Sequence, residues 1–246
     1  MKNLMITLCL MVWVSFTCWA QTNYVQFECG YMRAKSGHSD MFKKGLTAHN
    51  QKYHNVDPYK IYVWEVLTGP NSGTYFTALG PVSFTQLDKR PDSPEHNADW
   101  QNNVEVHMDY VGESSYWRRD TTLNYTPAGS DDFGKSRIRY VTLNPDESDR
   151  WAEQQEKVIE VYKAKNYPAA YAVYTRYGLS AGPTACSEIN FKDWAFLDSP
   201  NNFIKDFDEV HGVGAYERWL EEITISVDRT KTYDELISFI PELSSK

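Results

Sequence analysis

A stretch in the first half of the chain recurs, as a pattern, in the second half. Residues 57–88 align without a gap with residues 167–198; both contain a proline, an aromatic and β-branched run, a Gly/Pro/Ser turn, a second strand-like run and a closing Leu-Asp pair. The matching positions are Pro58 with Pro168, Val63 with Val173, Leu87 with Leu197 and Asp88 with Asp198. Because a repeat of this kind constrains the fold more than any single motif, the sequence predicts two copies of one structural unit.

Both copies have the same predicted order of elements, which is strand, helix, strand, strand, helix, strand. Alternating apolar residues predict the strands, and an apolar period of about 3.6 residues predicts the helices. In the first copy these elements are a strand at residues 24–32, a helix that follows the capping residues 36–40 and ends at about residue 53, and elements at residues 60–67, 74–86, 95–110 and 116–125. In the second copy they are residues 137–142, 144–165, 170–177, 184–196, 201–222 and 233–240. The Gly/Pro/Asp-rich stretch 126–135 separates the copies, so we expect units at 21–128 and 129–246.

The start of the chain has the features of a secretory signal peptide. Lys2 precedes an apolar core at residues 4–14, and the small residues Cys18 and Ala20 mark a cleavage site after Ala20. The apolar core is too short for a membrane span, so no membrane anchor is expected. We therefore expect residues 1–20 to be removed and the protein to be secreted or periplasmic.

The charge balance argues against two classes of partner. The chain carries 33 acidic and 25 basic residues, a net charge of −8, and has no run of lysines and arginines. Nucleic acids and anionic membranes attract basic surfaces, so neither is expected as a partner. Aromatic residues make up 15% of the chain, which is typical of a protein with large buried rings and amphipathic pocket walls.

The βαββαβ order is that of the ferredoxin-like fold, an antiparallel sheet with two helices on one face. Two such units in one chain can cover their open faces by packing sheet to sheet. From about residue 24 to residue 243 the chain thus resembles the dimeric α/β-barrel superfamily in a fused, two-repeat form, similar to the antibiotic-biosynthesis-monooxygenase-like and NIPSNAP-like families. The resemblance rests on element order and duplication, and it carries over no catalytic residue. It implies an α+β fold with a ligand cavity between the two sheets.

Strand alternation predicts which side chains face that cavity. Val63 and Val173 are assigned to the helix-facing sides of their strands, which leaves the alternate residues for the cavity. The candidate ligand-binding residues are Tyr62, Trp64, Tyr174, Arg176, Glu28, Arg139 and Glu188. An aromatic cavity with a few charged groups would suit a small organic molecule with a polar end. Two alternatives stay open: the charged residues pair between sheets, or the register is shifted by one and they face water.

The six histidines show neither H-x-x-x-H nor H-E-x-x-H spacing, so no helix by itself presents two zinc ligands and no metal site is predicted. Some members of the superfamily bind haem through a helix histidine. His107 and His211, each in the second predicted helix of its unit, are the candidates for such an axial ligand. Haem is thus a minority alternative to the expectation of no cofactor.

Cys29 and Cys186 remain after removal of the signal, and they either form a disulfide or stay separate buried thiols.

Three functions are compatible with the sequence. The first is a small-molecule-binding barrel, with a cofactor-independent, monooxygenase-like enzyme as its catalytic version. The second is a structural or interaction protein whose barrel is filled by its own rings, and the third is a haem protein. A monomer and a homodimer are both compatible with the sequence.

Overall fold

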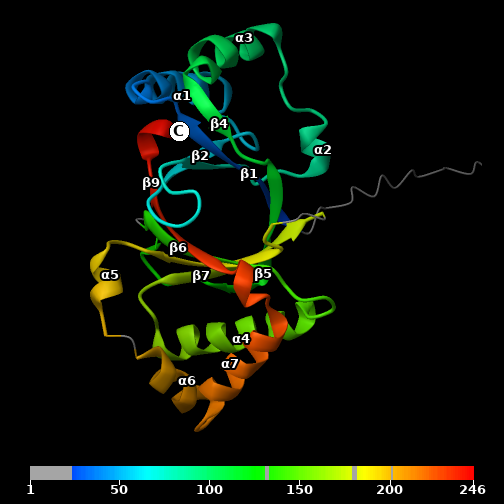
Figure 1. Cartoon of the computed structure of the whole chain (residues 1–246), viewed down its shortest axis with the longest axis vertical. Coiled ribbons are helices and arrows are strands. Elements are labelled where there is room, and N and C mark those ends of the chain that lie inside the picture. The colour runs from blue at the N-terminus through cyan, green and yellow to red at the C-terminus, as the bar shows by residue number, and fades with distance from the viewer. Residues whose placement is uncertain (1–23, 131–132, 179–181, 201) are drawn as a thin grey trace, which may run out of the picture.

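The computed structural model describes residues 24–130, 133–178, 182–200 and 202–246 (Figure 1). The predicted signal peptide lies outside the described residues. Within these ranges nine strands are formed, most of them where alternation predicts a strand. They are β1 (Val25–Ala34), β2 (Ile61–Val66), β3 (Tyr75–Leu79), β4 (Met108–Val111), β5 (Ser115–Tyr125), β6 (Lys135–Val141), β7 (Ala170–Tyr177), β8 (Ala185–Phe191) and β9 (Tyr233–Phe239).

Eight of these strands close into an antiparallel barrel. The spatial order is β3-β2-β9-β6-β8-β7-β5-β1, and a pairing of β1 with β3 closes the ring. The short strand β4 lies outside the ring and pairs with the end of β1. Because each barrel strand has two neighbours, closure removes the free edges that an open sheet would expose.

Both halves of the chain have the same internal strand order, β5-β1-β3-β2 in the first and β9-β6-β8-β7 in the second. The halves join where β2 pairs with β9 and where β5 pairs with β7. The predicted α+β barrel is confirmed at this level, as a closed eight-stranded antiparallel barrel flanked by helices.

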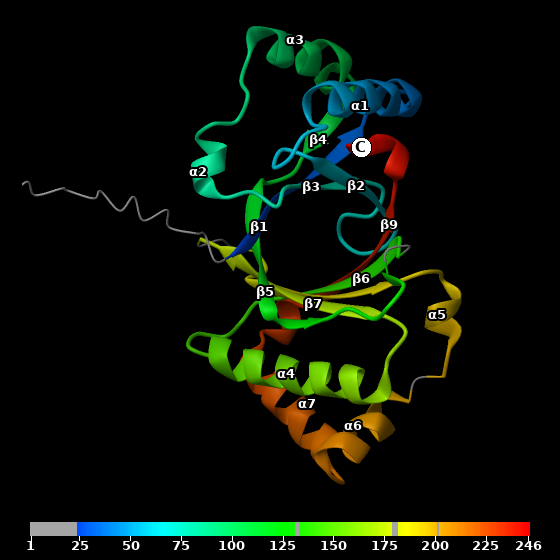
Figure 2. The ribbon, with the colours of Figure 1, turned by 180° about the vertical axis from the view of Figure 1, so that it is seen from behind.

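Helices cover two opposite sides of the barrel. On one side lie α1 (Ser39–Tyr53) and α3 (Pro94–Asn103), and on the other lie α4 (Ser148–Lys165), α6 (Phe203–His211) and α7 (Ala215–Ser226). Figure 2 shows α4 next to the strands, with α6 and α7 packed on its far side. The short helices α2 (Phe84–Leu87) and α5 (Ala195–Asp198) lie in connections. No described helix is long and apolar enough to cross a membrane.

Among the described residues, the buried apolar side chains form three clusters, one inside the barrel and one under each helical layer. Val63 and Val173 lie under the helices, as predicted, and Phe42 and Leu46 of α1 are buried beside Val63. Met41, the residue before Phe42, is 46% exposed. The rings in the barrel interior therefore form a core separate from the two helix-packed cores.

Two predicted elements end earlier than expected. The strand predicted over residues 74–86 ends at Leu79, because Gly80 has a φ of +136° and Pro81 has no N–H to donate to a sheet. Ser83 then caps α2 in a capping box with Gln86. The helix predicted over residues 95–110 ends at Asn103 and is followed by a 3-10 turn, Glu105–His107, and by β4.

Candidate functional site

The barrel encloses a cavity of about 100 Å³ that is walled largely by aromatic and aliphatic side chains. All eight strands of the barrel contribute to the wall. The lining residues are Phe27, Cys29, Trp64, Phe76, Ala78, Trp117, Ile138, Tyr140, Tyr174, Cys186, Glu188 and Ile237. The side chains that point inward thus fill most of the barrel and leave room for a small molecule only.

Glu188 provides the carboxylate among the described residues that line this cavity. One of its oxygens accepts a hydrogen bond from Ser136 Oγ at 2.6 Å, and the other accepts one from the Tyr174 hydroxyl at 3.1 Å. Burial raises the pKa of Tyr174 well above its ordinary value, so this hydroxyl keeps its proton and stays a donor. Since each carboxylate oxygen has two lone pairs, Glu188 can accept a further hydrogen bond from a ligand.

A second buried carboxylate, Glu235 of β9, was not predicted from the sequence. It accepts hydrogen bonds from the Tyr31 hydroxyl at 2.9 Å and from Asn71 Nδ2 at 2.8 Å, and the Tyr31 hydroxyl shares a further one with Tyr140. Burial raises the pKa of Glu235. Alternation could have found this residue, because Glu235 and Ile237 are two apart on a predicted strand and share its inner face.

Three of the predicted residues, Trp64, Tyr174 and Glu188, line the cavity. Arg176 is on the same face of β7 as Tyr174, but it is ion-paired with Glu113 at 2.6 Å and does not line the cavity. Tyr62, two positions before Trp64, is half-buried outside the cavity wall, with its ring 6.3 Å from that of Trp64. A ligand-binding role for these side chains stays a prediction.

Glu28 and Arg139 lie outside the barrel, contrary to the predicted register. Glu28 is ion-paired with Arg90 and accepts a hydrogen bond from Ser114 at 3.2 Å, and Arg139 pairs with Asp234 at 2.8 Å. The alternate residues of β1 and β6 take the inner positions that were predicted for Glu28 and Arg139.

The physical reason for the error is that β1 is covered on both faces. On its outer face Gln26 is fully buried, and a hydrogen bond that Arg118 Nε donates to its Oε1 at 3.0 Å offsets the cost of burying the amide. A polar residue in a strand therefore did not mark the cavity side.

Cys29 and Cys186 line the same cavity, and both are free thiols in the structure. Burial raises the pKa of both thiols, so neither is a ready nucleophile. They behave as small apolar parts of the wall.

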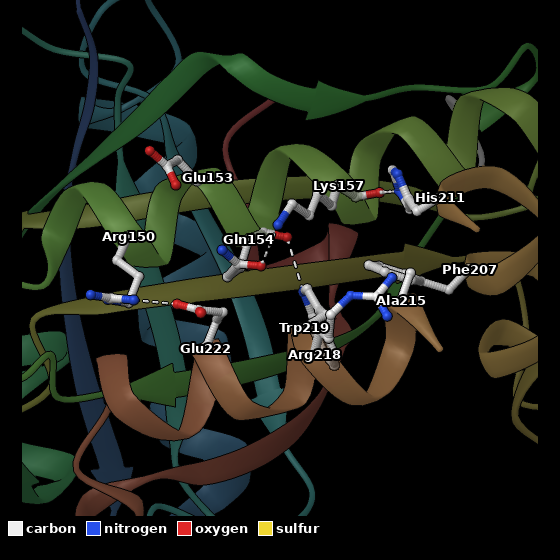
Figure 3. A pocket seen from close by; sticks show the side chains of 10 residues that line it. All are labelled: Arg150, Glu153, Gln154, Lys157, Phe207, His211, Ala215, Arg218, Trp219 and Glu222. Atoms are coloured by element: carbon white, nitrogen blue, oxygen red, sulfur yellow. Dashed lines mark hydrogen bonds and ion pairs between the residues drawn. The ribbon is translucent and has the colours of Figure 1, made fainter. Parts of the chain in front are cut away.

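The two histidines considered as haem ligands lie away from this cavity. His107 is on the 3-10 turn, where its Nδ1 is 3.0 Å from Nδ1 of His38. His211 ends α6 at the edge of a second hollow of about 530 Å³ between α4, α6 and α7 (Figure 3). Its Nε2 donates to the Lys157 carbonyl at 3.0 Å, and its Nδ1 is 3.6 Å from the Glu160 carboxylate.

The fold is shared with several solved structures. A proposed monooxygenase from Fusobacterium nucleatum is 9% identical with a TM-score of 0.58, covering 88% of this chain and 93% of its own. An anthrone oxidase-like protein is 12% identical with a TM-score of 0.54, covering 89% and 92%. A heme-binding protein from Thermus thermophilus is 9% identical with a TM-score of 0.50, covering 89% and 96%.

No protein-family model matches the sequence, and the search of curated proteins found no match. At these identities the structural likeness shows the fold alone. The chain is thus similar along most of its length to oxygenase-like and haem-binding α+β barrels.

Proposed function

We propose that this protein binds a small, largely apolar molecule inside the barrel, with a hydrogen-bond donor of the ligand held by Glu188. The observation that carries the proposal is the cavity itself, an aromatic wall with one carboxylate whose two oxygens are fixed by Ser136 and Tyr174. Apolar walls with a few placed polar groups are typical of ligand sites.

The size of the cavity limits the ligand. At about 100 Å³ it is much smaller than the roughly 300–1,000 Å³ of pockets for drug-sized molecules. An engineered apolar cavity of about 150 Å³ binds benzene, so a single aromatic ring is the upper limit here. Phenol combines such a ring with a donor for Glu188, and it is the probe we choose.

Haem does not fit this cavity. The cavity is too small for a macrocycle, and none of the described residues that line it is a histidine. At the second hollow the two ring nitrogens of His211 face a backbone carbonyl and a carboxylate. The haem-binding neighbour thus shares the barrel fold with this chain, while the described residues that line the barrel cavity of this chain include no histidine to act as an axial ligand.

Two further parts of the proposal concern the whole chain. We infer that the halves are tandem ferredoxin-like repeats, supported by their equal strand order and by the recurring pattern of residues 57–88. We also infer export, supported by the apolar core and the small residues before position 21. The catalytic extension would be a cofactor-independent oxidation of a bound phenol by molecular oxygen, in which one oxygen atom enters the ring to give a quinone and the other leaves as water. The descriptions of two neighbours as a monooxygenase and as anthrone oxidase-like support an oxidation.

The test is a titration with phenol and with benzene. Binding is monitored by tryptophan fluorescence, since Trp64 and Trp117 line the cavity. We expect both probes to bind. Ala78→Leu fills the cavity and should abolish binding of both. Glu188→Gln weakens the hydrogen bond to the ligand and should lower phenol affinity about 10-fold, corresponding to about 1.4 kcal/mol, and leave benzene unaffected.

The matched control for the carboxylate is Glu65→Gln, which changes an exposed residue of β2 and should alter neither titration. If neither probe changes the fluorescence or the melting temperature of the wild type, the proposal is wrong. The barrel would then be filled by its own rings, as expected for a structural or interaction protein.

A further inference from the structure

Three histidines that are separated in the sequence meet between α1 and α3, on the outer side of the barrel. His49 lies in α1, His54 directly follows the last residue of this helix, and His96 lies in the first turn of α3. Each offers a ring nitrogen, and the three nitrogens all lie within 4.8 Å of one another. The cluster is remote from the barrel cavity, whose described lining residues come only from strands.

The spacing of these nitrogens is close to that of a metal site. Nε2 of His49 is 3.1 Å from Nε2 of His96. Two imidazole nitrogens on one tetrahedral zinc ion lie roughly 3.3 Å apart, since each zinc–nitrogen bond is about 2.0–2.1 Å. One pair is therefore already close to the ligand–ligand distance. The third nitrogen lies within 4.8 Å of both others, so it would have to approach them by up to about 1.5 Å.

Two hydrogen bonds fix how the rings of the first two histidines are oriented. Nδ1 of His49 lies 2.8 Å from the Asp99 carboxylate, and Nδ1 of His54 lies 3.0 Å from the Tyr59 carbonyl. Both oxygens only accept, so each Nδ1 carries the proton and each neutral ring has its lone pair on Nε2. Carboxylate and carbonyl partners of this kind orient the histidine ligands of metal sites.

The third histidine supplies the proton that a metal ion would replace. With the lone pair of His49 on Nε2, the 3.1 Å contact needs His96 to donate its Nε2 proton. A metal ion takes the place of this proton, and His96 binds it as the tautomer protonated on Nδ1.

The described cluster provides three histidine ligands, and one of them is partly exposed. His49 is 1% and His54 7% exposed, whereas His96 is half-buried and lies toward solvent. The rings of Tyr53 and Trp100 pack against the cluster, with centroids 4.6 Å from His96 and 5.2 Å from His49. Three imidazoles with an open fourth position are a ligand set that suits zinc and its first-row neighbours.

We propose that His49, His54 and His96 bind one divalent transition-metal ion of the zinc class, with Asp99 positioning His49 and water in the fourth position. The site joins α3 to α1. Such a link has a structural purpose, because none of the residues of α3 is fully buried. Spacing along a single helix did not predict this site, because it is assembled from two helices and a helix end.

The test uses the full chain, freed of metal with a chelator and dialysed, and then titrated with zinc chloride under native mass spectrometry. We expect one tightly bound ion per chain and a higher melting temperature. X-ray absorption at the zinc edge should show three imidazole nitrogens at about 2.0 Å. Cobalt(II) should give the intense visible bands of a four-coordinate ion.

His96→Ala should lose the bound ion and the cobalt bands, and since His96 is half-buried this variant should fold. His211→Ala is the matched control, because it removes a histidine outside the cluster and should keep both. Asp99→Asn should weaken zinc binding by about 10- to 100-fold with the coordination unchanged. Absence of a bound ion in the wild type, or binding that His96→Ala leaves intact, would overturn the proposal.

Discussion

Glu235 shows how one buried side chain can make the stability of the barrel depend on pH. Its carboxyl is fully buried, and burial raises its pKa above the ordinary value of 4.5. At pH values between the ordinary pKa of the unfolded state and the raised pKa of the folded state, the folded state binds more protons than the unfolded state. The free energy of unfolding therefore falls as pH rises through that range. Glu235→Gln removes this group, and we expect its stability relative to the wild type to increase from pH 4 to pH 7.

Urea unfolding at a series of pH values measures this difference. The companion variant Glu235→Ala leaves the Tyr31 hydroxyl and the Asn71 amide without their acceptor, and it should lose about 1–3 kcal/mol at pH 7. If the free energies of unfolding of wild type and Glu235→Gln changed in parallel with pH across this range, the assignment of a raised pKa to Glu235 would be contradicted.

The contact of α1 with α3 depends on the absence of a side chain at Gly45. A Cβ built on Gly45 would lie 1.8 Å from the backbone carbonyl oxygen of Asn103. Alanine favours a helix over glycine by about 1 kcal/mol, but this clash is with backbone, so α1 and α3 would have to move apart to relieve it. We expect Gly45→Ala to cost about 1–3 kcal/mol in thermal or urea unfolding, and to weaken zinc binding because His96 moves with α3.

The control for this variant is Lys44→Ala, on the exposed face of the same helix, which should change neither stability nor zinc binding. If Gly45→Ala were as stable as the wild type and bound zinc equally, the close packing of α1 on α3 would not be needed to hold the cluster.

Elements were predictable from the sequence where one local pattern decides them. Trp151, Val158 and Ile159 recur with a helical period in the sequence, and all three are buried on one face of α4. The inner and outer faces of β1 were not predictable, since both are covered. Gln26 on the outer face is hydrogen-bonded to Arg118, which is far away in the sequence. The three-histidine cluster is of the same kind, because His49 and His96 are brought together only by the packing of their helices.

At the scale of the molecule, the two halves are interlocked as well as adjacent. Strand β9, from the second half, lies between β2 and β6. The residues that follow it cross onto the first half, where Asn50 Nδ2 donates to the Leu243 carbonyl at 2.7 Å and the Val63 N–H donates to Ser244 Oγ at 3.0 Å. Leu243 is 3% exposed and belongs to the core under α1. The core of the first half is therefore completed by residues of the second half.

This interlocking predicts that the described barrel unfolds as one unit. In urea, tryptophan fluorescence and far-UV circular dichroism should report one shared midpoint, because neither half keeps its core when β9 leaves. Deleting residues 242–246 removes a buried leucine and the hydrogen bonds to α1 and β2, and should cost about 3 kcal/mol while the single transition persists. Glu242→Ala, which changes an exposed side chain in the same segment, should have the wild-type midpoint. Two separate transitions in the wild type would mean that the halves fold independently and that the β2–β9 and β5–β7 seams contribute little.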